Sequence, residues 1–201
     1  MLLPALSKAR AAAQNIKCTS NVKQMCLGAF IYANENDDYL PGGWQGGNTW
    51  STSGAWNGSC GDVYGWWAEG LHHNWMYGVW KAGIDKSVFR CPGKSDGTTT
   101  GDANFANKDY MVGYTTPARM WCQPLGGLKR ASEQVIVLDS AIQMSYYACV
   151  PSPGWTPADF GLAFVGKNQH GDRCNLGFAD GHAASEKGNT ITNSADMFTN
   201  E

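Results

Sequence analysis

The feature that most constrains the fold of this chain is the segment 1–34, whose composition predicts one long helix. Ala, Leu, Lys, Arg, Gln and Met dominate it, and Pro4 is the only helix breaker before Gly28. At about 100° per residue, apolar side chains form one stripe that starts in the first turn. The stripe consists of Leu2, Leu6, Ala9, Ala13 and Ile16, and it is continued by Leu27 and Ile31.

A second apolar stripe begins only after residue 17 and lies on nearly the opposite side of the helix. The C-terminal half of the helix is therefore apolar on two sides, and we expect it to be buried in the globular body. The N-terminal half is apolar on one side, so we expect it to project or to pack against the helix of another chain. The second stripe consists of Cys18, Val22, Met25, Ala29 and Ala33.

Charge and composition narrow the function classes. Before Glu35 every charged residue is positive, which suits a solvated helix face or a contact with an acidic neighbouring subunit. Over the whole chain, 15 Lys and Arg stand against 17 Asp and Glu, and this balance argues against a nucleic-acid binder. Hydrophobic residues make up 43% of the 201 residues, enough for one domain with a core.

The rest of the chain divides into two regions. Residues 35–109 are rich in Gly and Trp and predict loops, with one short helix within 62–80. Residues 110–201 hold the strand candidates, which are rich in β-branched and aromatic residues. A helix followed by a late antiparallel sheet predicts an α+β domain, with the helix packed on the sheet. The expected strands are 110–114, 134–139, 144–150, 162–165, 174–179 and 182–185.

The last two expected strands flank Asp180-Gly181, a pair typical of a two-residue type I′ hairpin turn. By the period of two in a strand, Cys174, Leu176 and Phe178 should share one face. The alternate residues should share the other face. We therefore expect a C-terminal hairpin with one face turned toward the helix.

The Trp-rich region allows two interpretations. Exposed indole rings stack on sugar rings, so the region could bind carbohydrate or another extracellular polymer. Alternatively, a segment poor in Leu, Ile and Val uses its indoles as a small core of its own. The candidate stacking residues are Trp44, Trp50, Trp56 and Trp66.

His170, Asp180 and His182 form the nearest approach to a chemical constellation in the sequence. Such a set could bind a divalent metal, and a small metal-dependent enzyme would depend entirely on it. The structural interpretation makes Asp180 the hairpin turn residue and lets His170 close over the hairpin through a hydrogen bond. Because no nucleophile triad, phosphate loop or metalloprotease motif accompanies the set, we expect a protein that is not an enzyme and has no required cofactor.

Several motifs follow one another in a fixed order along the chain. Leu2–Arg10 opens the helix, Phe89-Arg90-Cys91-Pro92 lies in the middle, and His170 is followed by nine residues and then Asp180-Gly181. In this order the chain resembles the type IV pilin-like and type II secretion pseudopilin families, in particular the bacterial group whose prepilins end in an H-X9-DG element. Further matching positions are Cys18, Asn21–Gln24, Tyr32-Ala33 and Asp38–Pro41.

The resemblance implies a structural subunit of a secretion or pilus-like filament. Other pilin-like subunits would be its partners through the N-terminal helix, and His170, Asp180 and Gly181 would form its structural C-terminal signature. It also implies that a basic leader and an apolar membrane segment precede Met1 in the full prepilin. The present chain would then be a soluble, truncated ectodomain of an inner-membrane protein with its head in the periplasm or outside the cell.

The resemblance also bears on calcium and on disulfides. Some pseudopilins hold calcium through acidic loops near the C-terminus, but here only Asp172, Asp180 and Glu186 lie nearby. Seven scattered cysteines without a C-x-x-C pair suit disulfides in an oxidising compartment. Cys18 and Cys26 lie about 12 Å apart along one helix, too far to bond. Cys18 faces the buried side, and Cys91 of the Phe-Arg-Cys-Pro element is its expected partner.

Overall fold

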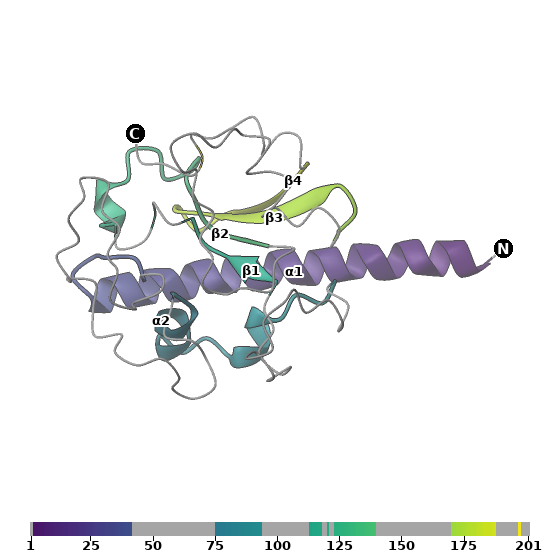
Figure 1. The fold of residues 1–201 in the computed structure, drawn as a ribbon, viewed down its shortest axis with the longest axis horizontal. Helices are drawn as coiled ribbons and strands as arrows, with labels where there is room; N and C mark the ends of the chain where they lie inside the picture. Colours follow the sequence, from purple (N-terminus) through teal and green to yellow (C-terminus); the bar gives the residue numbers. More distant parts are fainter. Residues whose placement is uncertain are drawn as a thin grey trace, which may run out of the picture.

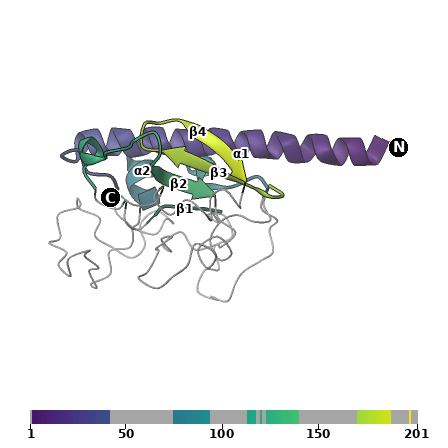
Figure 2. The ribbon, with the colours of Figure 1, turned by 90° about the horizontal axis from the view of Figure 1, so that it is seen from above.

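The protein is α+β, as the sequence predicts: a long helix lies against a small antiparallel sheet. The computed structural model describes residues 2–41, 75–93, 113–117, 120, 123–139, 170–187 and 197. Both views in Figures 1 and 2 show the helix α1 running the length of the molecule, with its N-terminal end extending beyond the sheet.

α1 spans Leu2–Glu35, close to the predicted range of 1–34. Pro4 falls in the first turn, where a missing backbone N–H removes no helical hydrogen bond. At the other end, Asp37 and Asp38 adopt positive φ angles of 53° and 68°. The Asp38 N–H donates to the Ala33 carbonyl at 2.9 Å, which satisfies one of the last carbonyl groups of the helix. The polar run after Asn34 therefore ends the helix through left-handed residues.

The sheet has four antiparallel strands in the order β1-β2-β3-β4. Three expected strands are confirmed, at 134–139, 174–179 and 182–185, while only the end of 110–114 enters the sheet. The expected strands 144–150 and 162–165 lie outside the described residues. The observed bounds are β1 Tyr114–Thr115, β2 Val135–Asp139, β3 Arg173–Phe178 and β4 Ala183–Lys187.

The β3–β4 hairpin differs from the expected two-residue type I′ turn. Gly181 has a φ of 89°, but Asp180 is absent from the residues with positive φ, whereas type I′ needs both. The Gly181 N–H donates to the Phe178 carbonyl, and the Phe178 N–H donates to the His182 carbonyl, each at 2.9 Å. The loop is therefore a three-residue turn of Ala179, Asp180 and Gly181, with glycine at the left-handed position. Asp180 stays right-handed because its carboxylate accepts from the His182 N–H at 3.0 Å.

The two faces of β3 pack as the alternation of apolar residues along the strand predicts. Cys174, Leu176 and Phe178 join Val135 and Leu138 in an apolar cluster on the face away from α1. The opposite face meets α1 so closely that a Cβ at position 177 would overlap the Sγ atom of Cys26. Gly177 therefore lets the helix approach the sheet.

On its other side, α1 contacts the short helix α2, Trp75–Lys81, which overlaps the end of the expected helix range 62–80. Trp75 is buried and packs edge to face on Phe89, with ring centroids 6.4 Å apart. Phe89 ends the 3₁₀ helix η1, Lys86–Phe89, and a second such turn, η4, spans Leu125–Gly127. The C-terminal half of α1 thus lies between α2 and the sheet.

The two apolar stripes of α1 differ in how far they are buried. All five residues of the second stripe, Cys18 to Ala33, are buried. Residues 3–13 are all exposed, as expected for a projecting half-helix. The expectation that the C-terminal half is buried on both sides is wrong at Leu27, which is 54% exposed. α2 and the sheet leave this strip of the helix uncovered among the described residues.

Candidate functional site

A buried cluster of two thiols, an imidazole and a carboxylate lies between α1 and the sheet. Cys18 comes from the middle of α1, and Cys91 follows η1. Asp139 is the last residue of β2, and His170 lies three residues before β3. The side chains of Asp139 and His170 are 0% and 1% exposed, and both thiols are buried. We call these four residues the thiol cluster.

The reactive atoms of the thiol cluster lie within contact distance of one another. The Sγ atoms of Cys18 and Cys91 are 3.4 Å apart, and the Cys91 Sγ lies 3.3 Å from His170 Nε2. Asp139 Oδ2 lies 3.7 Å from the Cys18 Sγ and 3.6 Å from the same His170 Nε2. The other carboxylate oxygen, Asp139 Oδ1, is buried without a hydrogen-bond partner among the described residues.

Neighbouring polar groups hold the thiol cluster in place. The Tyr114 hydroxyl lies 3.2 Å from the Cys18 Sγ and accepts from Asn21 Nδ2 at 3.2 Å. Asn175 Nδ2 donates to Asp139 Oδ2 at 2.9 Å, and Thr19 donates to Asn175 Oδ1 at 2.6 Å. These contacts connect α1, β1, β2 and β3, so the cluster lies at the junction of the helix and the sheet.

The environment shifts the pKa values of the cluster in different directions. Hydrogen bonding from Cys18, aided by His170, lowers the pKa of the Cys91 thiol to about 5 against its burial. The hydrogen bond with Cys91, together with burial and the charge of Asp139, raises the pKa of Cys18. Burial raises the pKa of Asp139 to about 6. Cys91 is therefore the thiol that ionises first.

The environment of His170 acts on its pKa in two opposite directions. Burial alone would lower the pKa of His170, but its hydrogen bond to Cys91 and the charges of Cys91 and Asp139 raise it overall. Both Cys91 and Asp139 approach the same ring nitrogen, Nε2. In a catalytic relay the base contacts its nucleophile and its carboxylate through opposite nitrogens. The described contacts therefore do not form such a relay.

The structure does not bring together the metal set expected from the sequence. His170 lies before β3, whereas Asp180 and His182 lie beyond its other end, a strand of about 20 Å away. At that end His182 Nδ1 lies 2.5 Å from Asp180 Oδ1, and both side chains are partly exposed. The expected acidic calcium group is also divided. Asp172 and Glu186 lie at one end of the hairpin, near the start of β3 and the end of β4, whereas Asp180 lies in the turn at the other end.

The expected role of His170 also needs correction. Its side chain does not close over the hairpin turn but contacts Cys91 and Asp139 at the opposite end of β3. The hairpin is closed instead by backbone hydrogen bonds and by the imidazole of His182. This ring stacks on Phe178 with centroids 4.1 Å apart.

Cys18 and Cys91, the expected disulfide pair, lie in contact with their Sγ atoms 3.4 Å apart, and the bond itself stays a prediction because both thiols are free in this structure. Cys26 and Cys174 are buried thiols as well, and burial raises the pKa of Cys26 to about 12. Cys60, Cys122 and Cys149 lie outside the described residues, as do the four candidate stacking residues Trp44, Trp50, Trp56 and Trp66.

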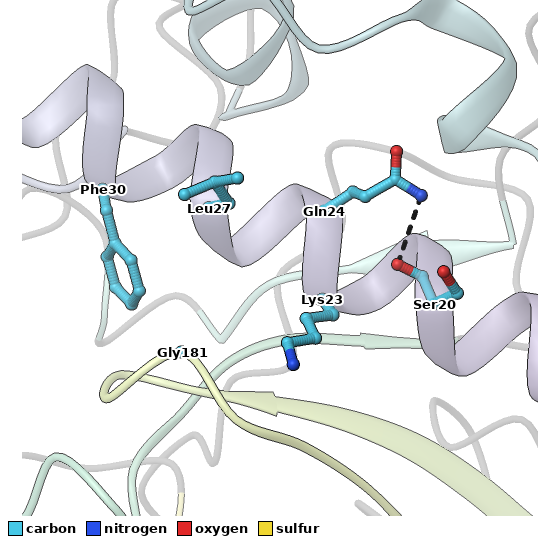
Figure 3. A pocket seen from close by; sticks show the side chains of 6 residues that line it. All are labelled: Ser20, Lys23, Gln24, Leu27, Phe30 and Gly181. Carbon is cyan, nitrogen blue, oxygen red and sulfur yellow. Dashed lines mark hydrogen bonds between the residues drawn. The ribbon is translucent and has the colours of Figure 1, made fainter.

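A second feature is the exposed face of α1. Leu3, Leu6 and Ile16 are 80%, 67% and 70% exposed. The face continues into an open pocket of about 340 Å³ beside the β3–β4 turn (Figure 3). The pocket is lined by Ser20, Lys23, Gln24, Leu27, Phe30 and Gly181.

Sequence reasoning did not identify Asp139, Tyr114 or Asn175 as part of a site. Asp139 carried a usable signal, because it is a carboxylate placed directly after the apolar run Val135–Leu138 of a buried strand. Asn175 carried a weaker one, as an amide on the strand face turned toward the helix. Tyr114 gave no signal apart from its strand.

Comparisons of this chain with protein-family models, with curated proteins and with solved structures gave no match. Among the described residues, no helix combines the length and hydropathy needed to cross a membrane.

Proposed function

We propose that this protein is a pilin-like structural subunit of a type II secretion or type IV pilus-like filament. The observation that carries the proposal is the divided helix α1. Its C-terminal half is fixed to the sheet, whereas residues 3–13 are exposed on all sides. Such a subunit needs one part of the helix to hold its head and another to pack between neighbouring subunits.

The pattern of exposure suits packing between copies. Large apolar side chains are costly to leave in water, and a run of them along one element is typical of an interaction surface. Here Leu3, Leu6, Ile16 and Leu27 are more than half exposed along α1. The order of motifs that resembles prepilins gives independent support. On this proposal the head lies outside the inner membrane, and the natural prepilin carries a membrane segment before this region.

Assembly in cells tests the proposal with two matched substitutions. Ala13 and Ala11 are both exposed and differ by about 200° around the helix, so only Ala13 lies on the apolar stripe. The full-length gene is expressed in the organism that encodes it, and surface filaments are sheared and probed for the subunit. We expect Ala13→Glu to remove the subunit from the filament fraction and Ala11→Glu to leave it there. Both purified heads should melt at the wild-type temperature.

Two results would count against this proposal. If the wild-type subunit is absent from every filament fraction, the protein is not a filament component. If Ala13→Glu assembles like the wild type, the apolar stripe is not the packing surface. Binding of carbohydrate by the Trp-rich region stays an untested alternative, because its candidate residues lie outside the described part of the chain.

A further inference from the structure

The thiol cluster is more than the disulfide pair expected from the sequence. It adds an imidazole and a carboxylate to the two sulfur atoms, and all four side chains come from different parts of the chain. The ligand atoms of Cys18, Cys91 and His170 all lie within 4.8 Å of one another. A disulfide would need only the two sulfurs, so the positions of His170 and Asp139 call for another explanation.

We propose that Cys18, Cys91 and His170 bind a thiophilic divalent cation of the zinc type, beside the buried carboxylate of Asp139. Zn²⁺ takes four ligands from Cys, His and Asp, with bonds of about 2.0–2.3 Å. A tetrahedron with such bonds has edges of about 3.3–3.8 Å. The 3.4 Å between the Sγ atoms of Cys18 and Cys91 and the 3.3 Å between Cys91 Sγ and His170 Nε2 both fall in this range.

The buried carboxylate of Asp139, which lies beside the cluster, gives a second observation that points to a nearby cation. Oδ1 is buried and has no hydrogen-bond partner among the described residues, which is costly for a carboxylate. Among the same residues, His170 is the only basic side chain that forms an ion pair with Asp139. A bound cation would balance the buried negative charge of the carboxylate and of the thiolates that metal binding creates.

The surroundings supply the outer contacts that metal ligands require. Asn175 donates to Asp139 Oδ2, and Tyr114 contacts the Cys18 sulfur. Such groups orient metal ligands and are part of most protein metal sites. Since both thiols and the imidazole are buried at the junction of α1 and the sheet, we expect a structural role for the metal. It would fasten α1 to the sheet.

Binding has a simple proton balance. Each thiol releases one proton as its sulfur becomes a thiolate ligand, and the imidazole binds through its neutral Nε2. No oxidant or reductant takes part. A Cys18–Cys91 disulfide is the competing outcome, because its formation removes both sulfur ligands. The metal site does not depend on the filament proposal, so either can fail alone.

Cobalt substitution of the full chain tests the site. The protein is reduced, freed of metal and titrated with Co²⁺, which reports thiolate ligands through an ultraviolet charge-transfer band and tetrahedral geometry through intense visible bands. We expect one Co²⁺ per chain, displaced by one Zn²⁺. Cys91→Ala and His170→Ala should lose the visible bands. Cys26→Ala is the matched control, since Cys26 is also a buried thiol of α1, and should keep them.

Thermal melts give a readout that does not depend on the spectrum. A chelator should lower the melting temperature of the zinc-loaded wild type and of Cys26→Ala, and leave His170→Ala unchanged. The proposal is overturned if the reduced wild type shows no thiolate-to-cobalt band, or if the band persists in Cys91→Ala. It is also overturned if the chain is isolated with a Cys18–Cys91 disulfide and fails to bind Co²⁺ after reduction.

Discussion

Between Leu3 and Ala13 every side chain of α1 is exposed, whereas from Cys18 to Ala33 the same helix carries a continuous buried stripe. Both halves are rich in good helix formers, so intrinsic propensity does not distinguish them. The difference lies in how many sides are apolar. The half with a second stripe is buried in the head, and the half with one stripe extends beyond it.

The two halves of α1 differ in how much they contribute to the stability of the head. The C-terminal half stabilises the head, because it meets the sheet at Gly177 and contributes to the main core. This core is the apolar cluster that α1 forms with α2, η1 and the sheet. Residues 3–13 of the N-terminal half are exposed, so they add little to the stability of the described head. Stability should therefore respond strongly to changes after residue 17 and weakly to changes before it.

The largest expected effect comes from truncating Met25, which is fully buried in the main core. Met25→Ala should lower the free energy of unfolding by about 2–5 kcal/mol. The matched change on the exposed half is Leu6→Ala, at a residue that is 67% exposed, and it should change stability by no more than about 0.5 kcal/mol. Urea denaturation of both variants measures the difference. Equal losses would show that the two halves of α1 stabilise the head alike.

A smaller effect is expected where helix and sheet approach each other most closely. A Cβ at position 177 would overlap Cys26 Sγ and lie 2.7 Å from Val22 Cγ1. Gly177→Ala should therefore destabilise the head by about 1–3 kcal/mol through overpacking. Combining it with Cys26→Ala removes one of the two clashing atoms, and the double variant should recover part of the loss. No recovery would mean that the clash with Cys26 is not the cause.

The hairpin turn provides a third test through two glycines with positive φ. Gly181 and Gly171 have φ angles of 89° and 74°. A Cβ at 181 would lie 2.8 Å from Phe30 Cε2, but at 171 it would meet nothing within 4 Å. Gly171→Ala should cost about 1 kcal/mol from backbone strain alone. Gly181→Ala should cost about 2 kcal/mol, because the contact with α1 adds to the strain.

Thermal melts of the two glycine variants decide this point. If Gly171→Ala costs as much as Gly181→Ala, the turn does not pack on Phe30. If neither change has an effect, the positive φ angles are not required at these positions.

The parts of the fold that sequence predicts are those governed by local pattern. The buried stripe of α1 follows from the period of the helix, and the faces of β3 follow from the period of a strand. The β3–β4 hairpin shows the limit of prediction from local pattern, since Asp180-Gly181 allows either a two-residue or a three-residue turn. The contacts among Asp180, Gly181 and His182 select the longer one.

The thiol cluster shows why a site is harder to predict than an element. Three of its contacts, Cys18–Cys91, Cys91–His170 and Cys18–Asp139, join residues 73, 79 and 121 positions apart, so only the three-dimensional packing brings them together. Cys18 and Cys91 could be paired because one faces the buried side of the helix and the other belongs to a matched motif. Asp139 could be singled out as a buried carboxylate after an apolar strand, but nothing local shows which residues it meets. His170 was grouped with Asp180 by motif spacing, but β3 separates them.

The smallest expected effect sharpens the comparison by locating the boundary between the two halves. Along α1, the first side-chain hydrogen bonds to the rest of the described chain come from Gln14 and Asn15. Gln14 Nε2 donates to the Pro92 carbonyl at 3.0 Å, and Asn15 Nδ2 donates to Ser185 Oγ at 3.4 Å. Deleting residues 1–13 should therefore change the free energy of unfolding by less than about 0.5 kcal/mol, because it removes only exposed side chains.

Deleting residues 1–17 is the matched control. It also removes the hydrogen bonds of Gln14 and Asn15 and leaves Cys18 at the chain end. The free energy of unfolding should therefore fall by a further ~1–2 kcal/mol. Far-UV circular dichroism should show a loss of helix in both deletions, while urea denaturation should show lower stability only in the longer one. If the shorter deletion already destabilises the head by more than about 1 kcal/mol, the projecting half of α1 supports the head and is not free for a partner.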